Sequence, residues 1–523
     1  MKKAISLLLS ALLILTATAS FASTEDASPY PETLRIFCTL SEHISKVGAD
    51  DLNDTYIFQE VERITGTHVE WIHPAAGSDV DAQINLMVAS GDLPDIIVRQ
   101  DWKNFSGGAN VWADDGVIYD LTELIPEHMP YYNAYITQTP NAINDLSIGG
   151  RMYYVSEIQH GMPFSGPIYR ADWLEKLGFN YPTTLDELYD VLNAFKTLDP
   201  NEDGKTDEWA MSGLKFTEGN FGPYFFLWPF GLTCDFMQID GKVTYGPMLP
   251  EFADAMAYIH KLYEDGILDP DYATQDRNSL DGKFMNDMVG FEFGIQPSKM
   301  NNTLADTSDF RAVGGPNLRL SPDSPPYVFH SMYISALTPS CDTVITTACE
   351  DPGKALHWLD FFYGGEGNVL ANFGIEGESF RYGESGVPTR DFSGALAKYP
   401  DRAEADLTYL YRIGGTSAFP MRMSIDSYLE GLHVNSAEGC TRWAQTADTS
   451  RMLPNVSLTP EERDQVNDKL VDIETYITAQ YDKLINGQTP LEDIPTIQQK
   501  LIDMGIEACI DVYQAAYDRY LGK

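Results

Sequence analysis

The segment Asp79-Val-Asp-Ala-Gln-Ile-Asn-Leu-Met-Val-Ala-Ser-Gly91-Asp-Leu-Pro-Asp-Ile-Ile-Val98 decides how the first part of the chain folds. Apolar residues recur at helical spacing through Val80, Ile84 and Val88, and Gly91 ends the pattern. The apolar run over 95–98 is short and rich in β-branched residues, which predicts a strand. The segment therefore predicts a helix that leads directly into a strand, as in α/β proteins.

The residues before this segment show the same alternation. We expect a strand over 34–40, a helix that Asp54 caps and Gly66 ends, and a second strand over 69–72. A β-α-β-α-β order favours an open, mostly parallel sheet. Ligands of such sheets lie off the carboxyl ends of the strands, so we expect residues 99–102 to border a site.

A second α/β unit begins near Gly166. Thr184 and Glu187 form a capping box for one of its helices. The other predicted elements are strands over 167–170 and 209–214, helices over 171–177 and 352–363, a return segment over 327–334, and C-terminal helices that begin with a cap at Thr459. The sequence contains no internal repeat and no Pro/Gly-rich linker, which favours two lobes crossed several times by one chain.

Residues 199–208, Asp-Pro-Asn-Glu-Asp-Gly-Lys-Thr-Asp-Glu, place oxygen-bearing side chains at alternate positions around a glycine. A Ca²⁺ loop of the EF-hand type is built in this way, because the ion takes about six to eight oxygen ligands and the loop must turn sharply. Asp199, Asn201 and Asp203 would supply side-chain oxygens, while Gly204 would allow the turn. The remaining predicted ligands are the Lys205 carbonyl, Asp207 and, as the closing carboxylate, Glu208.

Two features limit this interpretation. Ala210 occupies the twelfth position, where an EF-hand has a bidentate Glu, so a regulatory helix-loop-helix switch is disfavoured. Gly204, Lys205 and Thr206 also match the end of a P-loop, but Asp199 stands where the first P-loop glycine must be. We therefore exclude nucleotide binding there. A solvated acidic turn stays open as the alternative to a calcium site.

The N-terminus has the pattern of a secretory signal over residues 1–22. Lys2 and Lys3 give a charged start, an apolar run follows, and Ser20-Phe-Ala22 fits a small-x-small cleavage site. No stretch approaches the about 20 apolar residues of a membrane helix. We therefore expect an exported protein, periplasmic or at the cell surface. No lipobox cysteine lies near the cleavage site, since Cys38 is too far downstream.

The composition excludes some classes of partner. The chain has 35 basic and 77 acidic residues, a net charge of −42, which disfavours nucleic acid and anionic membrane surfaces and makes Ca²⁺ binding electrostatically easy. Six cysteines in 523 residues do not make a disulfide scaffold. Cys341 and Cys349 are either a disulfide or two buried thiols, and the sequence does not decide between them.

Five stretches share motifs with one protein family: 87–96, 168–178, 182–188, 358–377 and 510–521. In this order they resemble the large bacterial extracellular solute-binding proteins of ABC transporters, family 1. The similarity is greatest to the lipoprotein-like members related to alginate-binding periplasmic proteins, and it runs from about residue 34 to 521.

The resemblance implies a two-lobed periplasmic-binding-protein-like fold of type II, in which each lobe is a mostly parallel sheet flanked by helices and the C-terminal region is helical. Lobe 1 would comprise residues 30–162 and about 326–375, and lobe 2 would comprise 163–325 and about 376–523. It further implies a structural Ca²⁺ ion on the loop ligands named above. The implied function is that of a non-catalytic, monomeric receptor that closes on an oligosaccharide and delivers it to an ABC permease.

Aromatic residues make up 12% of the chain, and aromatic faces stack well on sugar rings. The candidate sugar-binding aromatics are Trp102, Tyr153, Tyr154, Trp228 and Trp443. For each of them, ordinary core packing is the alternative. The candidate polar contacts are Arg99, Asp101 and His160, and a solvated loop explains Arg99 and Asp101 about as well.

Catalytic signatures of the common kinds are absent from the sequence, including Gly-x-Ser-x-Gly, His-Glu-x-x-His and Gly-x-Gly-x-x-Gly. Two other functions stay open. One is a secreted carbohydrate-active hydrolase, which needs two carboxyl groups about 5–9.5 Å apart. The other is an adhesion or scaffold protein stabilised by Ca²⁺.

Overall fold

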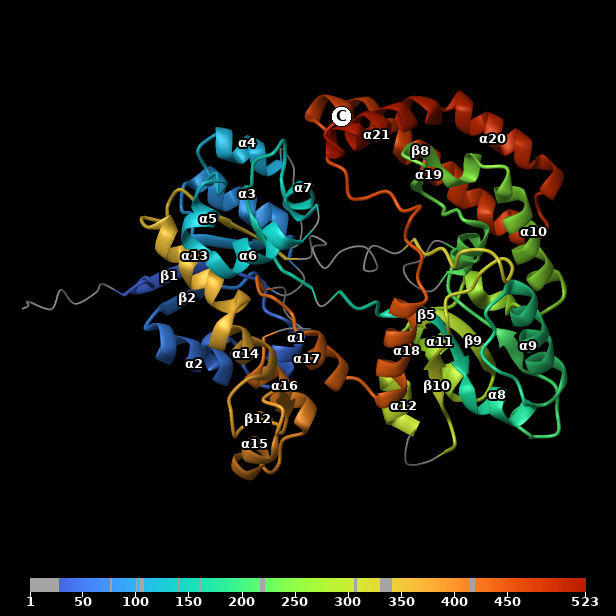
Figure 1. Ribbon diagram of the computed structural model, residues 1–523, viewed down its shortest axis with the longest axis horizontal. Helices are drawn as coiled ribbons and strands as arrows, with labels where there is room; N and C mark the ends of the chain where they lie inside the picture. The colour runs from blue at the N-terminus through green and yellow to red at the C-terminus, as the bar shows by residue number, and fades with distance from the viewer. Residues whose placement is uncertain are drawn as a thin grey trace, which may run out of the picture.

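The computed structural model describes residues 28–75, 78–99, 102, 108–139, 141–159, 161–216, 222–304, 308–329, 341–413 and 419–523. Two lobes lie side by side, each with a sheet of its own (Figure 1). The chain passes from lobe 1 to lobe 2 between residues 156 and 165, returns between 329 and 341, and passes again between 430 and 434. The predicted signal over 1–22 lies outside the described residues.

Lobe 1 contains a five-stranded sheet in the order β2-β1-β3-β11-β4. Its strands are β1 (Thr33–Phe37), β2 (His68–Ile72), β3 (Ile96–Arg99), β4 (Val155–Ser156) and β11 (Asp342–Ile345). The pairs β1–β2 and β1–β3 are parallel, as the alternation of strands and helices predicted. Strand β11 is antiparallel to both β3 and β4.

Helices cover both faces of this sheet (Figure 1). The helices of lobe 1 are α1 (Glu42–Lys46), α2 (Tyr56–Thr65), α3 (Val80–Ser90), α4 (Gly108–Asp114), α5 (Leu124–His128), α6 (Pro130–Gln138), α7 (Ala142–Leu146), α13 (Pro352–Asp360), α14 (Gly365–Phe373), α15 (Ser393–Lys398), α16 (Glu404–Tyr411) and α17 (Ile425–Glu430), of which the last three lie at the lower end of the lobe in Figure 1. Helix α2 begins one residue later than predicted: Thr55 is the N-cap, whose hydroxyl accepts from the Phe58 N–H, and Asp54 is not. Gly66 ends the helix with φ +72°, a conformation that favours glycine.

Lobe 2 contains a four-stranded sheet in the order β10-β5-β9-β6. Its strands are β5 (Ser165–Arg170), β6 (Trp209–Met211), β9 (Val289–Ile295) and β10 (Ala312–Gly314). Strand β5 is antiparallel to β9 and β10, and only β6 and β9 are parallel. The two sheets are therefore mixed, and the prediction of mostly parallel sheets needs this correction.

The reversed strands have a common position in the chain. Strand β5 is the first strand of its sheet after the first crossing between lobes, and β11 is the first after the second crossing. A chain that arrives from the other lobe enters the sheet from the end that faces that lobe. It therefore runs opposite to strands that are reached through a helix of the same lobe. The two-lobed division of the fold itself produces the mixed sheets.

The helices of lobe 2 include a C-terminal group, which caps the upper end of the lobe in Figure 1. The lobe contains α8 (Ala171–Leu177), α9 (Leu185–Thr197), the 3₁₀ segment η2 (Pro223–Phe230), α10 (Glu251–Glu264), α11 (Arg277–Met285), α12 (Ser298–Leu304), α18 (Val434–Gln445), α19 (Pro460–Ile485), α20 (Ile494–Asp503) and α21 (Ile506–Tyr520). A small hairpin of β7 (Phe236–Ile239) and β8 (Lys242–Tyr245) packs against α21. The predicted capping box at Thr184 and the predicted cap at Thr459 are both present, and the latter is also a capping box.

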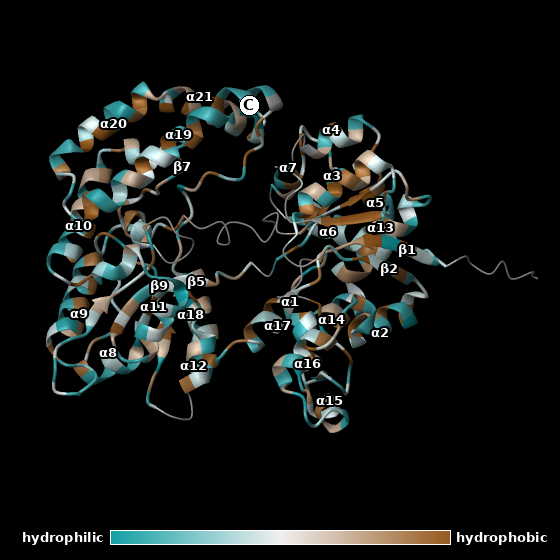
Figure 2. Ribbon diagram, turned by 180° about the vertical axis from the view of Figure 1, so that it is seen from behind, coloured by the Kyte–Doolittle hydropathy of each residue, from teal (hydrophilic) through white to brown (hydrophobic). Residues whose placement is uncertain are grey.

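The hydrophobic core of lobe 1 extends further along the chain than the sequence indicated. Phe392, Leu407 and Phe419 belong to the same buried cluster as the strands of lobe 1, where Figure 2 shows hydrophobic strands enclosed by helices. Val328 belongs instead to the core of lobe 2. We therefore propose lobe boundaries at about 28–158 with 341–423 and about 164–329 with 434–523. Of the predicted return segment over 327–334, residues 330–334 lie outside the described part.

All six cysteines are free thiols, which leaves Cys341 and Cys349 as two buried thiols. Among the described residues, no helix has both the length and the apolar character that crossing a membrane requires.

Candidate metal centre and ligand cleft

Residues 199–208, called the acidic loop from here on, connect the end of α9 to the start of β6. Its backbone curls because three of its residues have left-handed conformations: Asp199 with φ +47°, Glu202 with φ +60° and Gly204 with φ +86°. Glycine adopts this conformation without strain, and Asp is among the side chains that tolerate it best. The predicted sharp turn at Gly204 is thus present.

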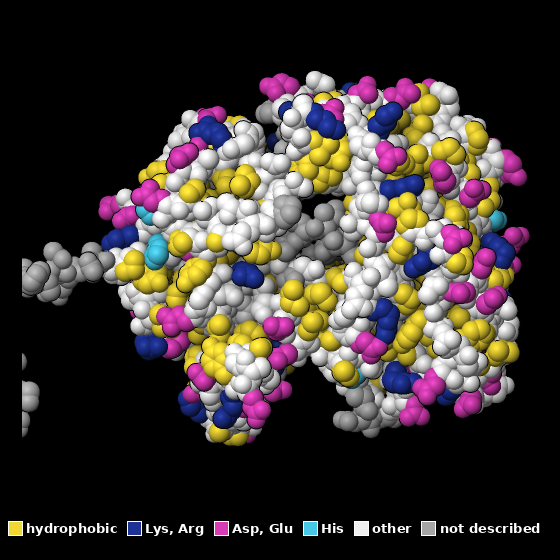
Figure 3. Space-filling model, in the orientation of Figure 1, with side chains coloured by type: hydrophobic (Ala, Val, Ile, Leu, Met, Phe, Trp, Pro, Cys, Tyr) yellow, Lys and Arg dark blue, Asp and Glu magenta, His cyan; other side chains and the backbone are white. Residues whose placement is uncertain are grey.

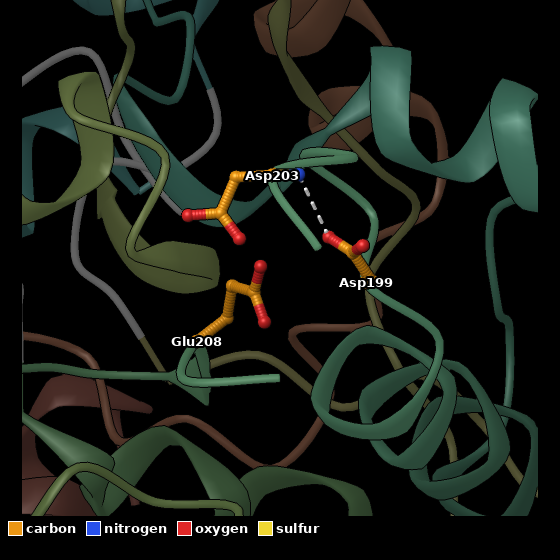
Figure 4. A group of neighbouring side chains, drawn as sticks. All are labelled: Asp199, Asp203 and Glu208. Carbon is orange, nitrogen blue, oxygen red and sulfur yellow. Dashed lines mark hydrogen bonds between the residues drawn. The ribbon is translucent and has the colours of Figure 1, made fainter. Parts of the chain in front are cut away.

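Three carboxylates converge inside the curl. One oxygen from each of Asp199, Asp203 and Glu208 lies within 4.8 Å of the others (Figure 4). Backbone N–H groups hold Asp199 in place, because the Asp203 N–H donates to its Oδ1 over 3.1 Å and the Gly204 N–H donates to its Oδ2 over 3.0 Å. The side-chain oxygen of Asn201 also accepts from the Asp203 N–H, over 3.0 Å. The loop therefore directs its oxygens inward.

Glu208 is the member of the group that most needs a cation. Its side chain is 4% exposed, and neither carboxylate oxygen has a hydrogen-bond partner among the described residues. Burial, together with the charges of Asp199, Asp207 and Asp203, raises the pKa of Glu208. An ionised carboxylate buried without a partner is costly, and an oxygen-coordinated cation removes that cost. The residues of this loop fit a Ca²⁺ ion.

The other predicted ligands lie at the exposed side of the loop. Lys205 Nζ donates to Asp203 Oδ2 over 2.7 Å and lies 3.8 Å from Asp207 Oδ2. Both Lys205 and Asp207 have exposed side chains, so Lys205 is free to leave these carboxylates when a stronger cation binds. Ala210 is buried in β6, and the closing carboxylate available to the loop is Glu208.

The ends of β3, β4 and β11 meet at the side of lobe 1 from which the chain crosses to lobe 2. The buried carboxylate of Asp342 holds them together, because it accepts from the backbone N–H of Trp102 over 3.3 Å and from the hydroxyl of Ser156 over 2.5 Å. Arg99 is the last residue of β3 and lies opposite Asp342 in the sheet register. The last residues of β3 and β4 and the first residue of β11, from distant parts of the sequence, thus lie at one place.

The candidate aromatic residues are buried in this structure. Trp102, Tyr154 and Trp443 are fully buried, and Tyr153 and Trp228 are nearly so. Trp102 packs edge-on against Trp112 in lobe 1. Trp443 lies beneath the sheet of lobe 2, where its Nε1 donates to the Pro167 carbonyl over 3.3 Å.

Two of these aromatics have a polar feature as well. The guanidinium of Arg151 lies 5.5 Å from the ring centre of Tyr153. The indole N–H of Trp228 is buried without a hydrogen-bond partner among the described residues. Asp101, His160 and the side chain of Arg99 lie outside the described part. The five candidate aromatic side chains therefore do not converge on one exposed surface. Their burial could not be predicted from a sequence pattern.

The lobes are separated by a notch that is visible in the space-filling view (Figure 3). A pocket of about 350 Å³ spans the lobes, with Ile148 of lobe 1 on one side and Phe236, Arg463 and Tyr513 of lobe 2 on the other. Residues 453–458 complete its wall. No local sequence pattern indicates this pocket, because its residues come from four separate parts of the chain, around residues 148, 235–236, 453–467 and 513.

Comparison with known sequences gives a consistent result. The model of the bacterial extracellular solute-binding protein family matches residues 57–373. The fructooligosaccharide ABC transporter substrate-binding protein FusA of Streptococcus pneumoniae is 26% identical over 506 residues, covering 91% of this chain and 89% of FusA.

Solved structures share the two-lobed fold. The alginate-binding protein AlgQ2 without calcium ion matches with a TM-score of 0.66 at 21% identity, over 94% of this chain and 98% of AlgQ2. An EF-hand mutant of FusA from S. pneumoniae, in complex with fructo-nystose, matches with a TM-score of 0.68 at 23% identity, over 94% of this chain and 99% of FusA.

Proposed function

The chain belongs to the bacterial extracellular solute-binding proteins, and from that premise we propose that it is an exported, non-catalytic receptor that captures an oligosaccharide between its lobes. The observation that carries this proposal is the pair of lobes, each with its own sheet and core, joined by three chain crossings. FusA, which resembles this chain over most of its length, is a fructooligosaccharide-binding protein of an ABC transporter.

A two-lobed receptor works by a shift in population. A ligand that contacts both lobes at once stabilises the closed arrangement relative to open ones, by as much as its affinities for the two arrangements differ. The closed receptor would then present its cargo to a membrane permease that a separate ATPase drives. We propose that the receptor acts as a monomer.

For the sugar contacts we propose Arg99, Asp101 and His160 as polar partners at the edge of the cleft. Because Trp102, Tyr154 and Trp443 are fully buried, we propose that these three support the cleft walls from beneath. Tyr153 and Trp228 are the aromatics proposed to reach the ligand. The unsatisfied indole N–H of Trp228 suits a sugar hydroxyl as acceptor.

We further propose that the acidic loop binds a structural Ca²⁺ ion through Asp199, Asn201, Asp203, the Lys205 carbonyl, Asp207 and Glu208. The buried, unpartnered carboxylate of Glu208 supports this assignment. The solved relatives support it too, since one is described without its calcium ion and another as an EF-hand mutant. The loop leads into the amino end of β6. Ligands of α/β folds lie at the carboxyl ends of the strands. The ion would therefore stabilise lobe 2 without touching the sugar.

Calorimetry with a panel of oligosaccharides, combined with product analysis of the same samples, tests the proposal. Saturable binding of one class, with the sugar recovered intact, is the expected result. Steady release of shortened sugar would instead identify the hydrolase. A protein that binds no sugar, yet joins cells or surfaces when Ca²⁺ is added, would be the adhesion or scaffold protein.

A further inference from the structure

A pocket of about 330 Å³ lies in lobe 1, next to the third crossing between the lobes. Arg390 at the end of β13 (Pro388–Arg390) and Arg412 just after α16 both line it. The hydroxyl-bearing residues of its wall are Thr408, Tyr409, Ser424, Ser427 and Tyr428. The last three belong to the segment that contains α17 and carries the chain toward lobe 2, so the pocket borders that segment directly.

The two guanidinium groups lack carboxylate partners in the part of the chain that the structure describes. Neither Arg390 nor Arg412 has a carboxylate oxygen within 4.0 Å among the described residues, and the Nε of Arg412 is buried without a hydrogen-bond partner there. The one partner of the Arg412 side chain in that part of the chain is neutral, the Ser427 hydroxyl, at 2.7 Å. Glu430 is close, but its carboxylate accepts from the backbone N–H of Arg390 over 3.1 Å and is exposed to solvent.

This arrangement is unusual for a chain with 77 acidic and 35 basic residues. The buried Arg170 shows the ordinary solution, because its guanidinium contacts Asp172 at 2.6 Å and Asp287 at 2.5 Å. Arg277 similarly contacts the buried Glu292 at 3.3 Å. Carboxylates are thus abundant and pair with other arginines, whereas Arg390 and Arg412 have no carboxylate partner among the residues that the structure describes.

Leaving two like charges together in a partly desolvated pocket costs free energy. Burial is the main cause that lowers the pKa of Arg412, to about 9, and the charge of Arg390 lowers it further while Glu430 acts in the opposite direction. Burial also lowers the pKa of Arg390, against the charges of Glu430 and Glu404. A bound anion would remove this cost, and guanidinium groups suit carboxylates because they form two parallel hydrogen bonds.

We propose that the pocket between Arg390 and Arg412 binds a carboxylate group. Two sources supply that chemistry: an acidic sugar residue within the captured oligosaccharide, or a small free carboxylic acid. The first source rests on the proposed receptor function, and the second does not. In either case the anion would lie against the segment that joins the lobes. Gly431 of that segment leaves room for the Arg390 side chain, because a Cβ added at Gly431 would lie 3.0 Å from Arg390 Nη2.

The test compares an acidic trisaccharide with its neutral ester, which differs from it in charge, and with a monomeric acid, which differs from it in length. Trigalacturonate, its neutral methyl ester and sodium galacturonate are titrated by calorimetry into the full-length protein, and melting temperatures are measured with the same three probes. The variants are Arg390→Gln and Arg412→Gln. Arg390→Gln removes a side chain that makes no hydrogen bond to the described residues, so this variant is expected to fold even if Arg412→Gln does not. Arg381→Gln is the charge-matched control, because Arg381 pairs with Asp391 on the exposed hairpin of lobe 1.

We expect the wild type to bind at least one of the acids tenfold or more tightly than the ester, and Arg390→Gln to abolish this preference while Arg381→Gln keeps it. Preference for trigalacturonate alone assigns the pocket to an acidic sugar, and an equal response to galacturonate assigns it to a free acid. Equal binding of acid and ester, no response to either acid, or a preference that survives in Arg390→Gln overturns the proposal. Tight binding of neutral sugars alone would overturn it and leave the receptor function intact.

Discussion

Individual residues determine what the acidic loop can bind. Asp199 and Asp203 are held by backbone N–H groups of the loop, whereas Glu208 is buried with no partner of its own among the described residues. Two carboxylates are therefore placed before any ion arrives, and the third is destabilised until one does. An ion that coordinates all three would tie the end of α9 to the start of β6, so we expect it to stabilise lobe 2.

The substitution Asp203→Ala tests this at the centre of the loop. At free Ca²⁺ about 100-fold above the dissociation constant, ion binding stabilises a folded protein by about 2.7 kcal/mol. We expect the wild type to melt at a higher temperature in Ca²⁺ than in EGTA, and Asp203→Ala to melt at the same temperature in both. Asp190→Ala removes an exposed carboxylate of α9 and should keep the calcium response. If the wild type melts identically with and without Ca²⁺, the loop is an acidic turn and nothing more.

Trp443 illustrates how a single residue can be assigned to packing. Its indole lies directly on the backbone of β10, where a Cβ added to Gly314 would be 2.7 Å from its Cε2 and 2.8 Å from the Gly439 Cα. We expect Gly314→Ala to destabilise the protein by about 1–3 kcal/mol, because an extra methyl group overpacks the site. Chemical denaturation measures the change. Gly282→Ala is the matched control, since its Cβ would have no neighbour within 4 Å. A neutral Gly314→Ala would show that the indole moves easily.

At the scale of elements, the C-terminal helices are joined by one ion pair. Glu462 closes the capping box of α19 and accepts two hydrogen bonds of 2.6 Å from Arg519 of α21. These bonds are the main cause that lowers the pKa of Glu462. A carboxylate with a lowered pKa in the folded state stabilises the protein above its unfolded pKa of about 4.3, and that stabilisation is lost as pH falls through the folded pKa.

We therefore expect Glu462→Gln to lower the free energy of unfolding by up to about 1 kcal/mol at pH 7, because the amide can still complete the capping box but loses the charge that pairs with Arg519. The difference from the wild type should close as pH falls below about 4. Hydrogen exchange in the first turn of α19 locates the effect, and chemical denaturation at several pH values measures it. Glu461→Gln, at a neighbouring exposed position, should change little at either pH. A pH-independent difference would mean that the side chain acts through shape and not through charge.

Elements were predicted best where their signals are local. Capping residues and terminal glycines lie within a few residues of the helices that they begin or end, so both limits of α3 and the starts of α9 and α19 could be predicted closely. Strand direction depends on where the chain comes from, and the reversal of β5 and β11 follows from crossings between lobes that no local pattern records. The burial of a side chain could not be predicted for the same reason. Trp102 follows a strand as expected, but it is buried because it packs against Trp112 and because its backbone N–H donates to Asp342, which is far away in the sequence.

At the scale of the whole molecule, lobe limits depend on which core a segment joins. The stretch around Phe392 and Leu407 follows the return crossing and looks like a continuation toward the C-terminus, yet its apolar residues complete the core of lobe 1. The acidic loop was easier, because a metal site made by one short segment needs no knowledge of the rest of the fold. To predict a ligand cleft between lobes, the whole fold must be known. Candidate residues could therefore be named from the sequence, but their positions relative to one another could not be predicted.

The lobes also touch at a place remote from the crossings. The Asn144 side chain of α7 in lobe 1 donates to the Tyr520 carbonyl of α21 in lobe 2 over 3.1 Å, and the charge of the neighbouring Asp145, after burial, raises the pKa of the Tyr520 hydroxyl. Figure 1 shows the C-terminal end of the chain beside α7. These contacts exist only while the lobes keep their present separation, so they favour this arrangement over wider ones.

An exposed hydrogen bond of this kind contributes about 0.5–1 kcal/mol, which corresponds to a two- to fivefold change in the population of the arrangement it stabilises. We expect Asn144→Ala to shift the ligand-free protein toward wider separations, seen as a larger radius of gyration in small-angle X-ray scattering, and to weaken sugar binding by the same factor. Asn133→Ala on α6, the preceding helix, is the control, because the Asn133 side chain makes no hydrogen bond to the described residues. Closure of the lobes and sugar binding are linked through one equilibrium. If Asn144→Ala changes the radius of gyration without changing the affinity for sugar, the ligand-bound protein has a lobe arrangement other than the one described here.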